Sequence, residues 1–302
     1  MKTTHLLTHL LTLLLTATTA LGQGPLAPLV APGPTMKTLD QIEPRIPIPS
    51  APIVPIVGPH FTITKPGSYY LTGNITVSSG EAIVIDTFVA SDVSIDLNGF
   101  TIRSTLTGSS SGSAIRCNGT FTRLTVRDGF LVSTSQVTSV PPKLQGFSNG
   151  IISGGILSEA FISNVHVSGM SNKGIFLDRQ SIVENCTATK NGGDGIYASD
   201  STVTNCSASS NRNDGIYALD GIVINCCVLN NLQDGISAIR GIVTNCRASG
   251  NGDDGIEVGV GVVTHCLASD NDADAVATDY QIKVTAGGQR IGSVPATEAG
   301  SP

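Results

Sequence analysis

The chain has 302 residues, of which 40% are hydrophobic but only 4% aromatic; none is Trp and 34 are Gly. A core of this composition has to use small and β-branched side chains, which excludes a leucine-rich helical bundle. The formal net charge is −6, and the 17 lysines and arginines form no cluster. Because nucleic-acid binding needs a concentrated basic face, nucleic acid is not an expected partner.

Residues 1–22 have the pattern of a secretory signal peptide. Lys2 precedes an apolar run from Leu6 to Leu15, and small residues follow at Ala20 and Gly22. The run is too short to span a bilayer, and no later segment approaches 18 apolar residues. We therefore expect cleavage after Gly22 and a mature protein that is secreted or extracellular, periplasmic or at the cell surface, with no membrane span.

Residues 23–59 are expected to form a proline-rich linker or a strap along a surface. Gly24 to Pro59 contains ten of the fifteen prolines, a density that blocks helices and central strands. Within it, "TMKTLDQIEP" (residues 35–44) is compatible with a short capping helix that ends at Pro44.

A repeat of twenty residues follows further along the chain. An aspartate, a valine, an Asn-Cys pair, a small apolar residue and a second asparagine recur in fixed register, and Gly-Ile follows the first four aspartates. The aspartate, valine and cysteine columns are Asp194, Asp214, Asp234, Asp254 and Asp274; Val183, Val203, Val223, Val243 and Val263; Cys186, Cys206, Cys226, Cys246 and Cys266. The asparagine columns are Asn185, Asn205, Asn225 and Asn245, continued by His265, and Asn191, Asn211, Asn231, Asn251 and Asn271.

This period, with short alternating segments between Gly and Asn, predicts a solenoid of parallel strands with one coil per repeat. Each strand would pair with its copies in neighbouring coils, about 4.8 Å away. The Ile, Val and Ala columns are expected to point inward, and the glycine after each aspartate to adopt a positive φ. We expect the aspartates to accept backbone N–H groups and the asparagines to form amide ladders along the bends.

The seven cysteines of an exported chain first suggest disulfides. Stacked cysteines, however, would have Cβ atoms about 4.8 Å apart, wider than the ~3.8 Å that a disulfide prefers. We therefore expect the column to be buried free thiols and Cys117 and Cys227, outside it, to be the more reactive ones. A straight column also lacks the four converging ligands of a zinc site.

The repeat resembles that of right-handed parallel β-helix proteins, the pectin-lyase-like superfamily, over residues 174–278. Upstream, "FTITKPGSYYLTGNITV" and "VSIDLNGFTI" are similar to the opening coils of secreted bacterial proteins of this type, mostly of unassigned function. Ile83, Ile115 and Ile151 would start three larger coils. The resemblance implies an all-β right-handed parallel β-helix of about nine coils over residues 60–285, followed by a flexible tail at residues 286–302.

The superfamily contains lyases, hydrolases, epimerases, adhesins and structural rods, so the fold leaves the activity open. "NGDDGIEV" (residues 251–258) resembles the paired aspartates of pectin-cleaving hydrolases, which would make Asp253 and Asp254 an acid and a base. "NGGDGIYA" and "NRNDGIYA" occupy the same register, so the pair is also explained as a repeat residue and its neighbour. The Gly-His-Gly and Arg-Ile-Lys elements of those hydrolases are absent, as is the Tyr-Gly-Phe-Asp-Pro-His signature of alginate epimerases.

No cofactor is expected, apart from a possible Ca²⁺ on the aspartate column at Asp194, Asp214 and Asp234. Carboxylates about 5 Å apart repel by about 1 kcal/mol in water, which a cation would relieve. The alternative is that backbone N–H groups and solvent provide the relief.

Residues that follow the inward isoleucines are expected to face outward. They form a column of Phe176, Tyr197, Tyr217, Ser237 and Glu257, with Asp200, Asp220 and Arg240 in the adjoining turn. Aromatic rings flanked by polar groups predict a glycan-binding surface, and the alternative is that the rings only stabilise the stack. The irregular stretch of residues 133–150 is expected to form a wall of this groove.

The sequence thus predicts a secreted, non-catalytic protein that binds a polysaccharide or cell-surface glycan or serves a structural role. The alternative is a lyase, epimerase or hydrolase acting on an acidic polysaccharide, with Glu257, Asp254, Asp253 and Arg240 as candidate catalytic residues.

Overall fold

The computed structural model of the protein describes residues 45–50, 56–86, 91–119, 121–153, 157–271, 281–285, 288–292 and 294–295. All of them belong to the compact unit from Arg45 to Pro302. The signal peptide expected at residues 1–22, the short helix expected at residues 35–44 and Asp274 lie outside the described residues. In the described ranges the chain forms strands and turns, and no helix there is long and apolar enough to cross a membrane.

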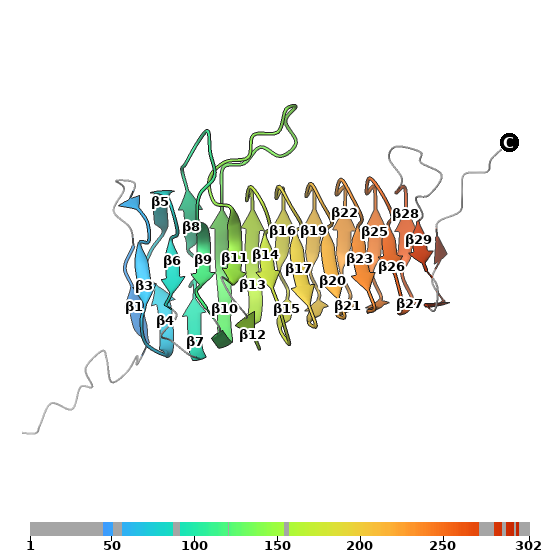
Figure 1. The fold of residues 1–302 in the computed structure, drawn as a ribbon, viewed down its shortest axis with the longest axis horizontal. Helices are drawn as coiled ribbons and strands as arrows, with labels where there is room; N and C mark the ends of the chain where they lie inside the picture. The colour runs from blue at the N-terminus through green and yellow to red at the C-terminus, as the bar shows by residue number, and fades with distance from the viewer. Residues whose placement is uncertain are drawn as a thin grey trace, which may run out of the picture. The chain divides into compact units, whose positions relative to one another are not determined.

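Ten parallel strands form one wall of the coil stack, here called the ten-stranded sheet (Figure 1). The register pairs equivalent positions of successive repeats, such as Ile196 with Ile216. The sequence predicts about nine coils, and the sheet has one strand more than this number. The additional strand is Phe61–Ile63, which precedes the strand at Ile83. Its strands are β3 (Phe61–Ile63), β6 (Ile83–Ile85), β9 (Ser113–Cys117), β11 (Asn149–Ser153), β14 (Ile175–Leu177), β17 (Ile196–Ser199), β20 (Ile216–Leu219), β23 (Ile236–Ile239), β26 (Ile256–Val258) and β29 (Ile282–Val284).

The second and third walls belong to one sheet of 21 strands, because the long strands β10 (Phe121–Val132) and β13 (Phe161–Ser168) take part in both walls. The second wall also contains β1 (Ile46–Ile48), β4 (Gly67–Leu71), β7 (Ser91–Asp96), β12 (Leu157–Ser158), β15 (Ile182–Glu184), β18 (Thr202–Thr204), β21 (Ile222–Ile224), β24 (Ile242–Thr244), β27 (Val262–Thr264) and β30 (Gln289–Ile291). The third contains β2 (Ile56–Val57), β5 (Ile75–Ser79), β8 (Thr101–Ser104), β16 (Thr187–Thr189), β19 (Ser207–Ser209), β22 (Cys227–Leu229), β25 (Arg247–Ser249), β28 (Leu267–Ser269) and β31 (Val294–Pro295).

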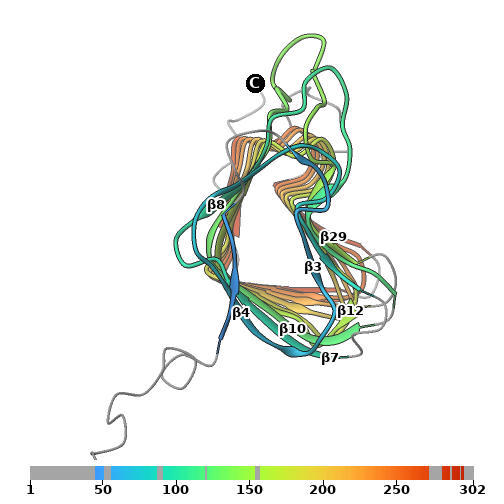
Figure 2. The same ribbon diagram turned by 90° about the vertical axis from the view of Figure 1, so that its left-hand side faces the viewer.

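Viewed along the stack, the three walls surround the core (Figure 2). The segments expected as a linker or strap and as a tail both contribute strands. In the first, β1 pairs with β4 and β2 with β5. In the second, β30 pairs with β27 and β31 with β28.

The chain turns from one wall to the next at single residues with left-handed backbone conformation. Between the second and third walls these are Asn185, Asn205, Asn225 and Asn245, each with φ 54°, and then His265 with φ 53°. Asparagine tolerates this conformation better than most residues, because its short polar side chain can bond locally. The asparagine column therefore marks a corner, and His265 takes the same bend position in the last coil of the column.

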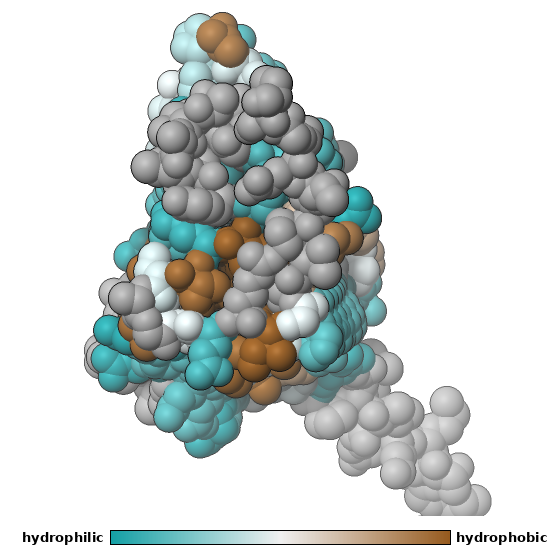
Figure 3. Space-filling model, turned by 90° about the vertical axis from the view of Figure 1, so that its right-hand side faces the viewer, coloured by the Kyte–Doolittle hydropathy of each residue, from teal (hydrophilic) through white to brown (hydrophobic). Residues whose placement is uncertain are grey.

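The core consists of the columns that the repeat predicts to point inward. Isoleucine at Ile196 and its copies, the valine column and the small apolar column that begins at Ala188 are all 0% exposed. At the C-terminal end of the stack, apolar surface is visible among polar side chains (Figure 3). Each buried isoleucine or valine contributes about 1.5–3 kcal/mol of hydrophobic free energy.

The glycine after each aspartate has a different role from the predicted one. Gly195 and its copies are not among the residues with positive φ. A Cβ atom on Gly195 would lie 2.6 Å from Asn211 Nδ2 and 2.6 Å from the carbonyl oxygen of Gly215. The expectation of positive φ was therefore wrong: glycine is required here because the next coil approaches the backbone too closely for a side chain.

The second asparagine column forms the predicted amide ladder inside the stack. Asn191 Nδ2 donates to Asn211 Oδ1 at 2.9 Å, and the same bond recurs at each step to Asn271. Each Oδ1 from Asn211 onward also accepts the backbone N–H of the preceding asparagine. Gln281 continues the ladder, as its Oε1 accepts from Asn271 Nδ2 at 2.9 Å. Buried polar groups are thereby paired along the whole column.

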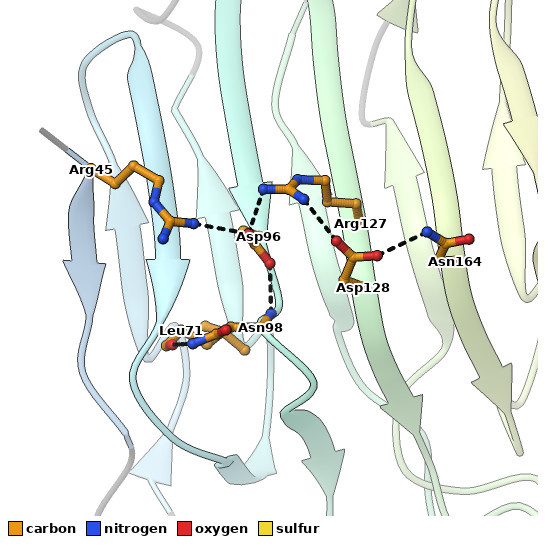
Figure 4. A network of polar contacts seen from close by, with 7 residues as sticks. All are labelled: Arg45, Leu71, Asp96, Asn98, Arg127, Asp128 and Asn164. Carbon is orange, nitrogen blue, oxygen red and sulfur yellow. Dashed lines mark hydrogen bonds and ion pairs between the residues drawn. The ribbon is translucent and has the colours of Figure 1, made fainter. Parts of the chain in front are cut away.

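The larger early coils are linked by a network centred on Asp96 (Figure 4). Its carboxylate accepts from Arg45 at 2.9 Å, from Arg127 at 2.5 Å and from the backbone N–H of Asn98 at 2.8 Å. Arg127 also contacts Asp128, which accepts from Asn164. Because Arg45 directly precedes β1, this network ties the first strand to the coils that follow.

The cysteine column is buried, as predicted, and all seven cysteines are free. The sulfur atoms accept backbone bonds from the neighbouring coil, such as Cys186 N to Cys206 Sγ at 3.4 Å. Cys117 was expected to be reactive, but it is 0% exposed, because alternation in β9 places it on the inner face with Ile115. Burial raises the pKa of its thiol to about 12. Cys227 is half-buried.

We predict that alkylation of the native protein modifies Cys227 alone among the seven cysteines, since the other thiols are buried. In denaturant all seven should react. Peptide mass spectrometry with an isotopically distinct second alkylating agent measures both sets. Rapid native labelling of Cys117 or of several column cysteines would contradict the inward assignment.

Candidate functional site on the ten-stranded sheet

One row of side chains follows the outer face of the ten-stranded sheet. The strand register aligns Phe176, Tyr197, Tyr217, Ser237, Glu257 and Lys283. We call these six residues the outer row. Ser237 is 5% exposed, whereas the larger side chains of the row are half-buried. The row therefore presents aromatic groups over three coils and charged groups over the last two.

The rings of the outer row stack on one another. The centroids of Tyr197 and Tyr217 are 4.8 Å apart with an interplanar angle of 12°, and those of Phe176 and Tyr197 are 4.9 Å apart at 53°. Lys173 Nζ lies 4.2 Å from the centroid of the Tyr197 ring. Ring faces are thus partly covered by neighbouring rings and by an ammonium group, which stabilises the stack.

The two tyrosine hydroxyls are available for a ligand. Within the described ranges, neither the Tyr197 nor the Tyr217 hydroxyl forms a hydrogen bond. A phenol hydroxyl both donates and accepts. Burial, followed by the charges of Tyr217, Asp178 and Asp194, raises the pKa of Tyr197, so this group stays protonated near neutral pH.

The aspartate column forms a ladder beside the outer row, in which Asp214 is half-buried and the other described members are buried. Asp214 Oδ1 accepts the backbone N–H of Asp234 at 3.1 Å, and Asp234 Oδ1 accepts that of Asp254 at 3.0 Å, as the sequence predicts. Asp194 forms an ion pair with Lys173. At the other end, Lys283 Nζ lies 2.9 Å from Asp254 Oδ2 and 2.9 Å from Glu257 Oε1. A lysine therefore neutralises each end of the ladder.

The two inner aspartates have no such ion pair with any described residue. Burial, followed by the charge of Asp194, raises the pKa of Asp214 to about 7. Burial, followed by the charges of Asp214 and Asp254, raises the pKa of Asp234 to about 8. Near neutral pH the ladder therefore holds protons, and protonation relieves much of the repulsion between stacked carboxylates.

The best oxygen cluster for a cation is shifted from the predicted position. Oxygen atoms of Asp234, Asp254 and Glu257 all lie within 4.8 Å of one another, whereas the sequence points to Asp194, Asp214 and Asp234. Lys283 Nζ already contacts two members of this cluster. A calcium ion would have to displace that ammonium group, so the residues present fit an internal ion pair better than a metal site.

The turn residues proposed to flank the rings lie at the corner after the ten-stranded sheet. Asp200, Asp220 and Arg240 have φ of 47°, 55° and 58°. Arg240 binds Asp220 through two hydrogen bonds of 2.7 and 2.6 Å. Asp220 raises the pKa of Arg240, with smaller contributions from Asp200 and Tyr217. Arg240 therefore sits beside the tyrosines but is paired with a carboxylate.

The candidate catalytic residues do not form an exposed acid–base pair. Asp254 is only 1% exposed, and its carboxylate is bound by Lys283. It clusters with Asp234 and Glu257, and Asp253 is not a member of that cluster. Glu257 is the most accessible carboxylate there, with its side chain 30% exposed.

Sequence reasoning missed Lys173 and Lys283. "KGIF" at residues 173–176 aligns with "DGIY" at residues 194–197, so Lys173 occupies the aspartate position of the preceding coil. This alignment could have revealed it. Lys283 aligns with Glu257 only through the strand register, because the two residues are 26 positions apart in the sequence and not 20.

The ladder predicts that stability falls as pH rises. Carboxyl groups with raised pKa in the folded state contribute stability at pH values below about 4, and this stability is lost as pH rises to about 8. Asn at Asp214 and Asp234 keeps the acceptor oxygen without the charge. We expect the D214N/D234N variant to exceed the wild type in unfolding free energy by at least about 1 kcal/mol at pH 9, and to differ little at pH 4.

Urea unfolding across this pH range measures the effect. The exposed corner substitution Asp200→Asn is the matched control and should leave the pH profile unchanged. Parallel profiles for the wild type and D214N/D234N would show that the inner aspartates are ionised in the folded state.

Comparison with known proteins agrees with this architecture. Residues 146–291 match the family model described as right handed beta helix region. The A-module of the Azotobacter vinelandii mannuronan C-5 epimerase AlgE6 superposes with a TM-score of 0.52 at 17% identity, covering 77% of this chain and 91% of that module. For the AlgE4 A-module of the same organism the TM-score is 0.53 at 17% identity, with 76% and 87% covered.

The enzymatically active domain of bacteriophage CBA120 tailspike protein 2 has a TM-score of 0.55 at 14% identity, with 76% of this chain and 38% of that chain covered. At these identities the likeness concerns the fold alone. A search of curated proteins finds no significant match. The parallel walls and the twenty-residue coil identify the chain as a right-handed parallel β-helix protein, and its residues 146–291 match the model of the right handed beta helix region.

Proposed function

We propose that the protein acts outside the cell as a non-catalytic glycan-binding protein and that the aromatic part of its outer row, Phe176, Tyr197 and Tyr217, binds a polysaccharide. The observation that carries the proposal is the continuous row of Phe176, Tyr197 and Tyr217, whose two phenol hydroxyls lack partners in the described chain. Polar groups at the adjoining corner, such as Asp200, border the row. Rings beside hydrogen-bonding groups match the mixed apolar and hydroxyl surface of a sugar.

The stacking geometry defines how a sugar would be held. Because the rings cover part of each other's faces, a glycan would contact ring edges and phenol hydroxyls rather than lie flat on an open ring. A chain of sugars along the stack would meet an aromatic ring at each of three successive coils, since the register aligns Phe176, Tyr197 and Tyr217. Support also comes from the fold neighbours, two of which are epimerases named for mannuronan.

A second candidate function is a lyase, epimerase or hydrolase on an acidic polysaccharide. The contact of Lys283 with Glu257, next to the protonated Asp234, favours it, because a carboxylate, an ammonium group and an acid lie together. Asp254 and Asp234 are buried, however, which leaves Glu257 as the accessible acid or base. An enzyme needs several such groups facing one substrate, so we favour binding.

The binding proposal predicts that Y197A/Y217A loses retention on an immobilised glycan. A panel of acidic and neutral polysaccharides identifies the retained one, and the apparent Kd should rise at least about tenfold, or 1.4 kcal/mol. Y197F/Y217F keeps the stacked rings and removes only the hydroxyls, so it should keep the wild-type Tm and lose part of the retention. A purely structural row would give the opposite pattern: a lower Tm in Y197A/Y217A and unchanged retention.

For catalysis we expect a negative result. Incubation of wild-type protein with the retained polysaccharide should yield no new chain ends, no unsaturated products and no epimerised sugars, by chromatography and NMR. E257Q should bind as the wild type does, because Glu257 lies two coils beyond Tyr217. Turnover by the wild type that E257Q abolishes would establish the enzyme and refute the non-catalytic proposal.

A further inference from the structure

A second surface lies at the corner that leads into the ten-stranded sheet. The loop of residues 133–150 projects from the coil stack there (Figures 1 and 2). It faces Ser210 and Arg212 of one coil and Asn230 and Leu232 of the next, and together they enclose a groove of about 450 Å³. Its lining contains no residue of the outer row. The loop therefore forms the wall of this groove, and not of a groove at the aromatic column as the sequence predicts.

The loop is held in place at its base. Phe147 is 0% exposed, and its backbone N–H donates to Ser133 Oγ at 2.6 Å. Ser135 Oγ donates to the carbonyl oxygen of Gln145 at 2.6 Å. Higher in the loop, Gln136 and Lys143 exchange backbone hydrogen bonds. The wall is thus formed before any ligand arrives, which lowers the entropic cost of binding.

The groove combines apolar walls with hydroxyl and amide groups. Val140 is 99% exposed and Leu232 is 61% exposed, although they line the same concave surface. The remaining lining residues are Val137, Thr138, Ser139, Pro142, Ser210, Arg212 and Asn230. Exposed apolar groups beside a few convergent polar ones are typical of a ligand site.

Arg212 is the single charged residue of this lining, and no carboxylate accompanies it. In the described part of the chain its guanidinium forms no ion pair and no side-chain hydrogen bond. Two other cationic residues belong to these segments. Lys190 occupies the corner position of the preceding coil that is equivalent to Ser210, and Lys143 lies in the loop. A guanidinium matches a carboxylate in a bidentate geometry.

We propose that this groove binds a carboxylate-bearing sugar, with Arg212 pairing the carboxylate. Ser210, Thr138 and Asn230 then supply bonds to sugar hydroxyls, and Val140 and Leu232 contact the apolar face of the ring. The site is separate from the outer row, so it does not depend on glycan binding there.

Titration calorimetry of the full chain with a galacturonic acid trisaccharide tests the site at low salt. We expect R212Q to weaken binding at least tenfold and R212K to fall between R212Q and the wild type, because lysine keeps the charge but not the fork. Arg247→Gln is the matched control: Arg247 is an exposed arginine of the third wall, outside the groove lining, and its replacement should change nothing. V140D, at a fully exposed position, should also weaken binding by repulsion.

Three outcomes would overturn the proposal. The wild type could fail to bind the trisaccharide, or it could bind the methyl-esterified trisaccharide as tightly as the free acid. It could also bind a glutamate trimer as tightly as the trisaccharide, which would indicate an acidic peptide as the ligand. Equal Tm values for the wild type and R212Q exclude misfolding, and V140D gives an independent reading if R212Q is unstable. Y197A/Y217A separates the two sites. It should bind the trisaccharide normally, and its loss of polysaccharide retention concerns only the outer row.

Discussion

Parallel hydrogen bonds between successive coils fix a register in which each residue of the regular stack lies on the residue twenty positions before it. Every other feature depends on this register. It places isoleucine on isoleucine in the core and asparagine on asparagine in the amide ladder. It also forbids a side chain where one backbone crosses close to the next, which explains the glycine that follows each aspartate. A side chain that suits one coil must therefore suit contact with its own copy.

Charge is where this constraint is hardest to satisfy. Aspartates stacked on aspartates repel, and burial removes the water that would screen them. The molecule combines three remedies: backbone N–H donors along the ladder, a lysine at each end and protons on the two inner carboxyls. A fourth remedy is found at the exposed corner. There Arg240 stacks on Asp220, so that an ion pair takes the place of two like charges in the column. The same register by itself generates pKa shifts, so strong shifts here are weak grounds for an active site.

The two candidate binding surfaces arise from the outward side chains of the repeat and from a loop inserted into it. The outer row uses the repeat itself, since the same outward position carries three aromatic rings in succession. The groove at Arg212 depends on an insertion, the loop of residues 133–150, which is anchored through Phe147 and leans over coils that follow it in sequence. One surface is regular and open, and the other is irregular and preorganised.

Sequence alone determined the regular part of this protein, because a twenty-residue period and strand alternation are local patterns. The inward columns, the amide ladder from Asn191, the corner at Asn185 and the outer row could all be predicted that way. Only the tertiary structure decided which residues meet across irregular turns. It placed Lys283 against Asp254 and Glu257 and set the loop over Arg212 instead of the tyrosines. These contacts depend on the path of segments that lack the period, and a path through space is not encoded in spacing along the chain.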